Sequence, residues 1–161
     1  GFSREEALEF IRRTEKAGIQ IFEQPVNRNS SEQLGMISRN IPVPVMADES
    51  ITTLGEAFRL ASNDLIDMVN IKLMKVGGIL NAQHINSVAK AARMEVMTGC
   101  LDECGLAISA GLHFALSRPN IEFADLDGHL DMKDDPFSGL FTVRNGVLFP
   151  SDAPGLGKVD I

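Results

Sequence analysis

Short runs of β-branched and other apolar residues alternate along the chain with longer stretches whose apolar residues recur at helical spacing. Five of the short runs are predicted to be strands, at residues 19–22, 44–47, 67–71, 94–97 and 121–124. Strands that alternate with helices are typical of βα units, in which crossover helices join parallel strands. The pattern therefore predicts an α/β chain built on a parallel sheet.

The predicted strands end at nearly equal intervals. The residues that close or follow them are 24 to 27 positions apart and are, in order, Glu23, Asp48, Lys72, Thr98 and Asp125. A strand, a helix and their two connections need about that many residues, so each interval is predicted to hold one βα unit. The chain should contain about five such units.

Capping residues mark the expected helix starts. Three pairs of residues fit the capping box, in which a hydroxyl and a carboxylate or amide three positions later satisfy free backbone amides. The pairs are Ser3 with Glu6, Ser30 with Gln33, and Thr53 with Glu56. Two further helices are expected, one after Gly77 and Gly78 and one over residues 103–116.

The region after Asp125 has a different pattern, in which Gly, Pro and Asp interrupt the apolar spacing. Asn145-Gly146 lies between two short apolar runs, and this dipeptide favours the tight turn of a β-hairpin. Residues 153–157 are expected to form a loop. We predict a single domain, with the βα units in residues 1–128 and a C-terminal loop and hairpin in residues 129–161.

Sequential βα units with right-handed crossovers either close into a barrel or open into a doubly wound sheet. No Gly-x-Gly-x-x-Gly follows a predicted strand, which weakens the nucleotide-binding interpretation. Polar residues follow the predicted strands, as in a barrel whose active site gathers at the carboxyl ends of the strands. A complete barrel takes roughly 250 residues. The fold expected for 161 residues is therefore a partial TIM-like (β/α) barrel.

Composition and charge narrow the classes of partner. The chain is 44% hydrophobic and 23% charged, which is typical of a globular protein. A net charge of −7 argues against a nucleic-acid surface, which needs clustered Lys and Arg. No apolar run approaches the roughly 18–20 residues of a membrane span, and no signal peptide is recognised. Two cysteines cannot form a secreted disulfide framework, so a cytoplasmic location is expected.

Two acidic residues end neighbouring predicted strands. The carboxylates of Glu23 and Asp48 should lie side by side, where they would repel unless one is protonated or a cation lies between them. Carboxylate oxygens and water are the ligands that Mg²⁺ prefers, so this pair predicts a magnesium site. The alternative is that these residues cap the helices that follow, as Asp48 could before Glu49 and Ser50.

A lysine ends the next strand, within reach of the same volume. A lysine that is close to a metal and partly desolvated has a lowered pKa, which makes Lys72 a candidate general base. It would abstract a proton alpha to a carboxylate, and the metal would stabilise the resulting enediolate. Lys75 lies three residues on, and either lysine could instead be a surface charge.

Five ordered motifs resemble the enolase superfamily, in its muconate-lactonizing and dipeptide-epimerase branch. These motifs are IFEQPV at 21–26, PVMADES at 44–50, VNIKLMKVGGI at 69–79, MTGCLDECGLA at 97–107 and FADLDGHL at 123–130. The resemblance implies that Glu23 and Asp48 bind Mg²⁺ and that Lys72 is one of two catalytic bases acting on opposite faces of the substrate. It also implies that the chain corresponds to the last five βα units of a barrel.

The resemblance further implies a substrate. Asp125-Leu126-Asp127 resembles the Asp-x-Asp with which dipeptide epimerases hold the ammonium group of an N-terminal amino acid. Cys100 falls where a small residue of the family lines the site, which implies a substrate contact. Glu103 is expected either to join a hydrogen-bond network at the same strand end or to be an acidic residue at the helix start. The predicted partner is a small molecule, a dipeptide or a related carboxylate.

The same comparison sets expectations for the molecule as a whole. The first metal ligand, the first catalytic lysine and the N-terminal capping domain of the family are expected to precede this stretch of chain, so the chain alone is expected to be inactive. The predicted reaction is Mg²⁺-dependent epimerisation, with a cycloisomerase or dehydratase as the alternative. A third hypothesis is a non-catalytic fragment. Open sheet edges predict pairing with another chain, and hence a homo-oligomer.

Overall fold

The computed structural model describes residues 1–158 and shows a five-stranded parallel sheet. The strands lie in chain order, which is β1-β2-β3-β4-β5. Their bounds are Phe22–Glu23, Val45–Ala47, Met68–Lys72, Glu95–Gly99 and Ile121–Ala124. A sheet whose order follows the chain has no reversal of direction, so the winding is that of a barrel and not of a doubly wound sheet. The predicted fold class is confirmed.

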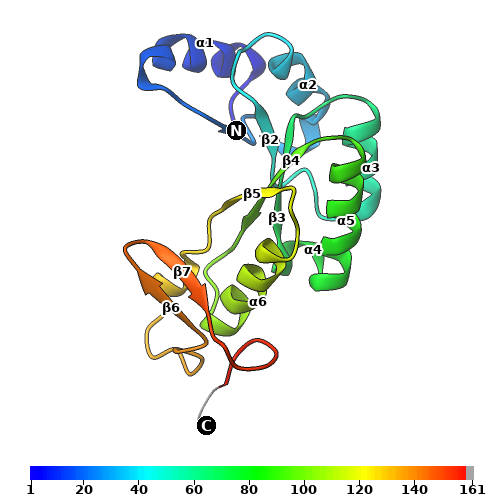
Figure 1. Ribbon diagram of the computed structural model, residues 1–161. Helices are drawn as coiled ribbons and strands as arrows, with labels where there is room; N and C mark the ends of the chain where they lie inside the picture. Colours follow the sequence, from blue (N-terminus) through cyan, green and yellow to red (C-terminus); the bar gives the residue numbers. More distant parts are fainter. Residues whose placement is uncertain (159–161) are drawn as a thin grey trace.

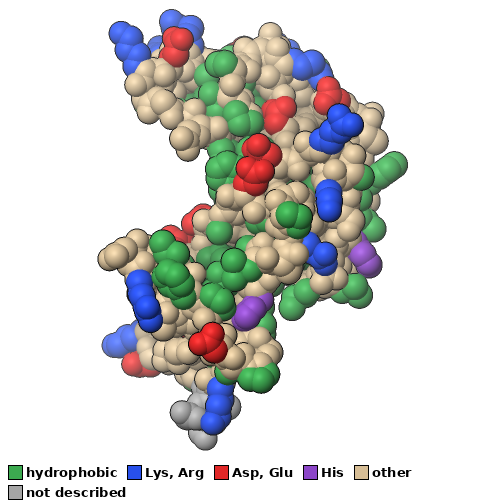
Figure 2. Space-filling view, in the orientation of Figure 1, with side chains coloured by type: hydrophobic (Ala, Val, Ile, Leu, Met, Phe, Trp, Pro, Cys, Tyr) green, Lys and Arg blue, Asp and Glu red, His purple; other side chains and the backbone are tan. Residues whose placement is uncertain are grey.

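Helices cover one side of this sheet. The α-helices in chain order are α1 (Arg4–Thr14), α2 (Glu32–Ser38), α3 (Leu54–Ser62), α4 (Leu73–Val76), α5 (Ile79–Ala91) and α6 (Gly105–Leu116). In Figure 1, α3 and α5 lie side by side on the right of the sheet, and the space-filling outline is concave on the left (Figure 2). No helix within residues 1–158 is both long and apolar enough to cross a membrane.

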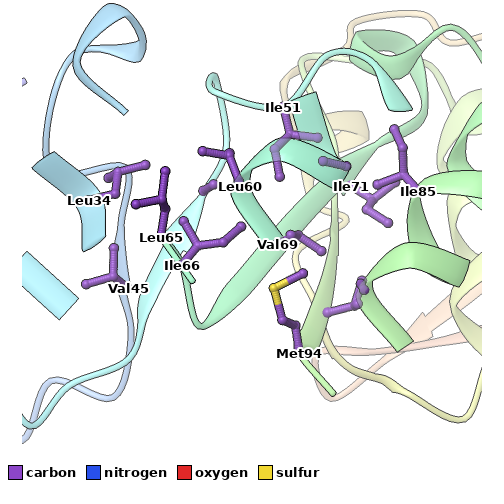
Figure 3. Packing of buried hydrophobic residues seen from close by; sticks show 14 of the residues in the cluster. Leu34, Val45, Ile51, Leu60, Leu65, Ile66, Val69, Ile71, Ile85 and Met94 are labelled. Atoms are coloured by element: carbon purple, nitrogen blue, oxygen red, sulfur yellow. The ribbon is translucent and has the colours of Figure 1, made fainter. Parts of the chain in front are cut away.

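Alternate residues of the strands build the core against these helices. Val69 and Ile71 of β3 belong to the main buried cluster together with Leu60 of α3 and Ile85 of α5 (Figure 3). The residue between them, Asn70, is 1% exposed and points to the opposite face of the sheet. Because side chains alternate along a strand, Lys72 lies on the same face as Asn70. One face therefore holds the fold together and the other carries polar groups.

Two of the three predicted capping boxes are confirmed. The Ser3 and Thr53 side chains each accept from the backbone amide of a glutamate three residues on, and the carboxylate of that glutamate accepts from the backbone amide of Ser3 or Thr53. The prediction for Ser30 is wrong, because α2 begins at Glu32. Asn27 accepts from the backbone amide of Asn29 and starts the short 3-10 helix Arg28–Ser30 before it.

Two predicted element starts differ from the structure by two residues or more. Strand β1 is limited to Phe22–Glu23, because it pairs with β2 only through these two residues. Gly18, in the left-handed region at φ 68°, ends the 3-10 helix Glu15–Ala17 before the strand. Helix α6 begins at Gly105, two residues after the predicted start, with Cys104 as its N-cap residue.

The C-terminal hairpin is confirmed. Strands β6 (Phe141–Arg144) and β7 (Val147–Pro150) pair in antiparallel fashion. Asn145 and Gly146 in the turn have φ of 52° and 77°, the positive values that the tight turn of a hairpin requires. The predicted C-terminal segment includes residues 159–161, which lie outside the described residues.

An aspartate of this C-terminal segment ties it to the barrel units. The Asp135 carboxylate accepts from the backbone amide of Gly105 at 2.5 Å and from that of Phe137 at 2.9 Å. It therefore acts as a cap for α6 although it lies 30 residues away in sequence. We expect Asp135→Ala to lower the free energy of unfolding by about 1–2 kcal/mol, the usual cost of a lost cap. Urea denaturation checks this, with the exposed Asp131→Ala as a control that should change little.

Candidate active site

Polar side chains gather where β1, β2 and β3 end. The parallel register pairs Glu23 with Met46, which places Asp48 just beyond the carboxyl end of β2. Lys72 is the last residue of β3. The Lys72 ammonium group donates to Asp48 Oδ2 at 2.9 Å, so the predicted metal ligand and the predicted base are in contact. Glu23 is the exposed member of the set.

Asp48 is held by two lysines. Lys75 donates to Asp48 Oδ1, to the backbone carbonyl oxygen of Asp48 at 2.7 Å and to that of Asn70 at 2.9 Å. The three charged side chains are largely buried, with 10% of Asp48, 17% of Lys72 and 11% of Lys75 exposed. The interpretation of either lysine as a surface charge does not describe this structure.

Burial and pairing act in opposite directions on these groups. Burial alone would raise the pKa of Asp48, but the hydrogen bonds from Lys75 and Lys72 outweigh it and the pKa is lowered. Burial opposes the charge of Lys72, but the bond to Asp48 and its negative charge raise the pKa. This direction is opposite to the one expected for a desolvated lysine beside a metal. Burial dominates at Lys75, where the pKa is lowered.

Glu23 is connected to β3 by an amide. Asn70 Nδ2 donates to Glu23 Oε1 at 2.7 Å. The sequence motifs assign no function to Asn70. A signal for it exists, since an amide two residues before Lys72 in an otherwise apolar strand must lie on the face that carries Lys72.

A second amide fixes the loop of Asp48. Gln24 Oε1 accepts from the backbone amides of Asp48 at 2.9 Å and Ser50 at 3.2 Å. Gln24 Nε2 donates to Val26 O and to Ser50 Oγ, both at 2.9 Å. Gln24 has a φ of 35°, an unusual value for a residue other than glycine. These bonds join the end of β1 to the loop after β2. No sequence pattern predicts them, because the partners lie more than 20 residues apart.

The donor set of this site fits a hard cation in part. Glu23 and Asp48 supply carboxylate oxygens from adjacent strand ends, which is the chemistry that Mg²⁺ accepts, usually with several waters. No group of three or more His, Cys, Asp or Glu residues within residues 1–158 could hold a metal ion. Two carboxylates are thus the contribution that this part of the chain can make to a Mg²⁺ site.

A second group of predicted residues lies at the ends of β4 and β5. Cys100 Sγ lies 3.8 Å from Asp127 Oδ1, and the backbone amide of Gly128 donates to Cys100 Sγ at 3.3 Å. Asp125 and Asp127 are exposed, and the Asp125 amide donates to the carbonyl oxygen of Thr98 at 3.0 Å. Burial raises the pKa of the Cys100 thiol. The structure therefore brings Cys100 and Asp127 together.

Glu103 occupies a buried position in the loop that follows β4. It is 4% exposed, and its Oε1 accepts from the backbone amide of Leu101 at 2.8 Å. This loop packs closely against Gly128, since a Cβ at Gly128 would lie 2.0 Å from the carbonyl oxygen of Leu101. Glu103 thus orders the loop that packs against the segment of Asp127. Both cysteines are free thiols.

The chain is similar to known proteins over nearly its whole length. Residues 1–159 match the family model of the enolase C-terminal domain-like proteins. The chain is 40% identical over 161 residues to the L-Ala-D/L-Glu epimerase of Bacillus subtilis, covering 99% of this chain and 44% of that protein. A substrate-liganded structure of that epimerase matches 98% of this chain and 44% of its own, with a TM-score of 0.93.

Two further relatives show the range of the similarity. The dipeptide epimerase of Cytophaga hutchinsonii, solved with Mg and the dipeptide D-Ala-L-Val, is 35% identical with a TM-score of 0.92, covering 98% of this chain and 43% of its own. Muconate cycloisomerase 1 of Rhodococcus opacus is 32% identical, covering 94% of this chain and 41% of that protein. The chain spans less than half the length of the curated relatives it matches. It belongs to the enolase C-terminal domain-like family.

Proposed function

We propose that this chain is the part of a Mg²⁺-dependent dipeptide epimerase that carries two metal ligands and one of the two acid/base residues. The observation that carries the proposal is the contact between Lys72 and Asp48 at the ends of adjacent strands, at 2.9 Å. The relatives named as dipeptide epimerases support the choice of reaction. Because the chain spans under half the length of those relatives, activity and Mg²⁺ binding are to be measured on the full-length protein.

The proposed roles follow from position and charge. Glu23 and Asp48 would hold Mg²⁺, which would supply positive charge beside the substrate carboxylate. Lys72 serves one face of the substrate α-carbon. The bond to Asp48, which raises the pKa of Lys72, favours the charged form that returns a proton, and in the opposite direction the neutral form removes the α-proton. Lys75 holds the Asp48 carboxylate through a bond to Oδ1, which keeps that group oriented.

Substrate recognition is assigned to the ends of β4 and β5. The exposed carboxylates of Asp125 and Asp127 would pair with the ammonium group of an N-terminal amino acid. Cys100, beside Asp127, would form a small contact surface for the same end of the substrate. Glu103 would keep that loop ordered through Leu101.

A cycloisomerase is the second candidate, favoured by the similarity to muconate cycloisomerase 1. The two candidates differ in whether the substrate carries an ammonium group. We expect the double replacement Asp125→Asn and Asp127→Asn to raise KM for a dipeptide by about 10-fold or more, since each charge-assisted bond contributes roughly 1.5–3 kcal/mol. Steady-state kinetics on a dipeptide panel check this. An unchanged KM would contradict the role given to the two aspartates, and a wild-type protein that is inactive on every dipeptide would favour the cycloisomerase.

A further inference from the structure

We propose that Asn70 is a positioning residue that holds the Glu23 carboxylate for Mg²⁺, and that Gly99 exists to make room for it. The inference deepens the proposed function and rests on it. It assigns a role to a residue in the middle of a buried strand. Asn70 is 1% exposed, and its Nδ2 donates to Glu23 Oε1 at 2.7 Å.

Glu23 needs such a partner because of its surroundings. It ends a strand of two residues, and it is exposed although the groups it should act with are buried. A glutamate side chain at such a position has several rotamers of similar energy. The bond from a fixed amide selects the rotamer that directs the carboxylate toward the end of β3. Residues that orient metal ligands in this way commonly change metal affinity 10- to 100-fold when they are replaced.

Gly99 on the neighbouring strand fits the shape of Asn70. The register pairs Gly99 with Lys72, and a Cβ at Gly99 would lie 2.5 Å from Asn70 Oδ1 and 2.9 Å from Asn70 Nδ2. A carbon atom does not tolerate contacts of that length with oxygen or nitrogen, so a side chain at this position would displace the amide. Gly99 is not one of the glycines whose φ is positive. Space for Asn70, and not backbone conformation, therefore explains the glycine.

The amide is costly to the fold, which indicates that it serves another purpose. Asn70 Oδ1 is buried and has no hydrogen-bond partner within residues 1–158. The orientation of the Asn70 amide follows from this bond. Rotating the amide by 180° would bring Oδ1 against the Glu23 carboxylate, and two acceptor oxygens would then repel. A leucine has nearly the same branched shape and no polar atom to satisfy. An apolar residue would suit the strand better, so the bond to Glu23 is the reason that an amide is retained.

The decisive experiment compares Mg²⁺ binding and stability of Asn70→Leu with those of the same replacement at a second buried asparagine. Asn86 is 3% exposed and exchanges two hydrogen bonds with Asn120, at 2.9 and 3.2 Å, at the start of β5 and not at the carboxyl ends of the strands. Asn86→Leu is therefore a control for the loss of a buried amide as such. Both variants are made in the full-length protein, and titration calorimetry with MgCl₂ and thermal unfolding are measured for each.

We expect Asn70→Leu to bind Mg²⁺ about 10-fold or more weakly while its midpoint of thermal unfolding stays at or above that of the wild type. Asn86→Leu should unfold at a lower temperature and bind Mg²⁺ as the wild type does. Gly99→Ala should weaken Mg²⁺ binding as Asn70→Leu does, although it leaves Glu23 and Asn70 in place.

Three results would overturn the inference. Wild-type Mg²⁺ affinity in Asn70→Leu would show that Asn70 does not hold the ligand. A fall in affinity that accompanies the same loss of stability as in Asn86→Leu would show a merely structural role. A wild-type protein that binds no Mg²⁺ would contradict the proposed function as well, so the two failures are distinguishable.

Discussion

Replacing Lys72 with alanine in the full-length protein is expected to abolish exchange of the substrate α-proton from one face of the dipeptide. The reason is that the Lys72 amine, fixed by Asp48 at 2.9 Å, is assigned to one face only. General acid–base groups of this kind contribute roughly 10²- to 10⁴-fold to a rate. Epimerisation should fall by about that factor in both directions, because Lys72 is the base in one direction and the acid in the other. Deuterium incorporation from D₂O into each epimer, followed by NMR, measures the two faces separately.

The control for this experiment is another lysine of the chain. Lys90 is exposed near the end of α5, so Lys90→Ala should exchange both epimers normally. Equal exchange of both epimers by Lys72→Ala would contradict the assignment of Lys72. Loss of both together with loss of Mg²⁺ binding would contradict it too, because Lys72 would then act on the metal site alone.

Replacing Asp48 with alanine is expected to remove Mg²⁺ binding and to destabilise the protein. Asp48 pairs with two lysines that are only 17% and 11% exposed, and its removal leaves both ammonium groups without their carboxylate. Breaking a buried ion pair on one side typically costs about 3–5 kcal/mol. The free energy of unfolding from urea denaturation and calorimetry with MgCl₂ test the two effects.

The neighbouring acidic residue offers a matched control for Asp48. Glu49 is exposed, and Glu49→Ala should change the free energy of unfolding by no more than about 0.5 kcal/mol and leave Mg²⁺ binding intact. An Asp48→Ala protein as stable as the wild type would contradict the structural role given to the two lysines. Retained Mg²⁺ affinity would contradict the role of Asp48 as a ligand.

The order of the sheet could be predicted from sequence because its signals are local. Each strand is a short apolar run, and a polar residue such as Asp48 or Lys72 follows at a regular interval. Capping at Ser3 and Thr53 depends on residues three positions away, so it could be predicted as well. Strand β1 was predicted too long, because its length depends on pairing with β2, which lies over 20 residues along the chain.

The contacts that organise the site could not be predicted in the same way. Gln24, Asn70 and Asp135 act through partners that are 24 to 47 residues distant in sequence. Their bonds depend on which strand ends and loops the fold brings together, and no local pattern records that. Lys75 appeared equivalent to a surface charge, because its burial depends on the packing of the turn after β3 against Asp48.

The measurement that tests the proposed function most directly is deuterium incorporation at the α-carbon of a dipeptide by the full-length protein in D₂O, with and without Mg²⁺. We expect exchange that requires Mg²⁺ and yields both epimers, because the two carboxylates and Lys72 at the strand ends support a proton transfer that depends on the metal. Absence of exchange across a panel of dipeptides, or exchange that persists after the removal of divalent metal, would contradict it.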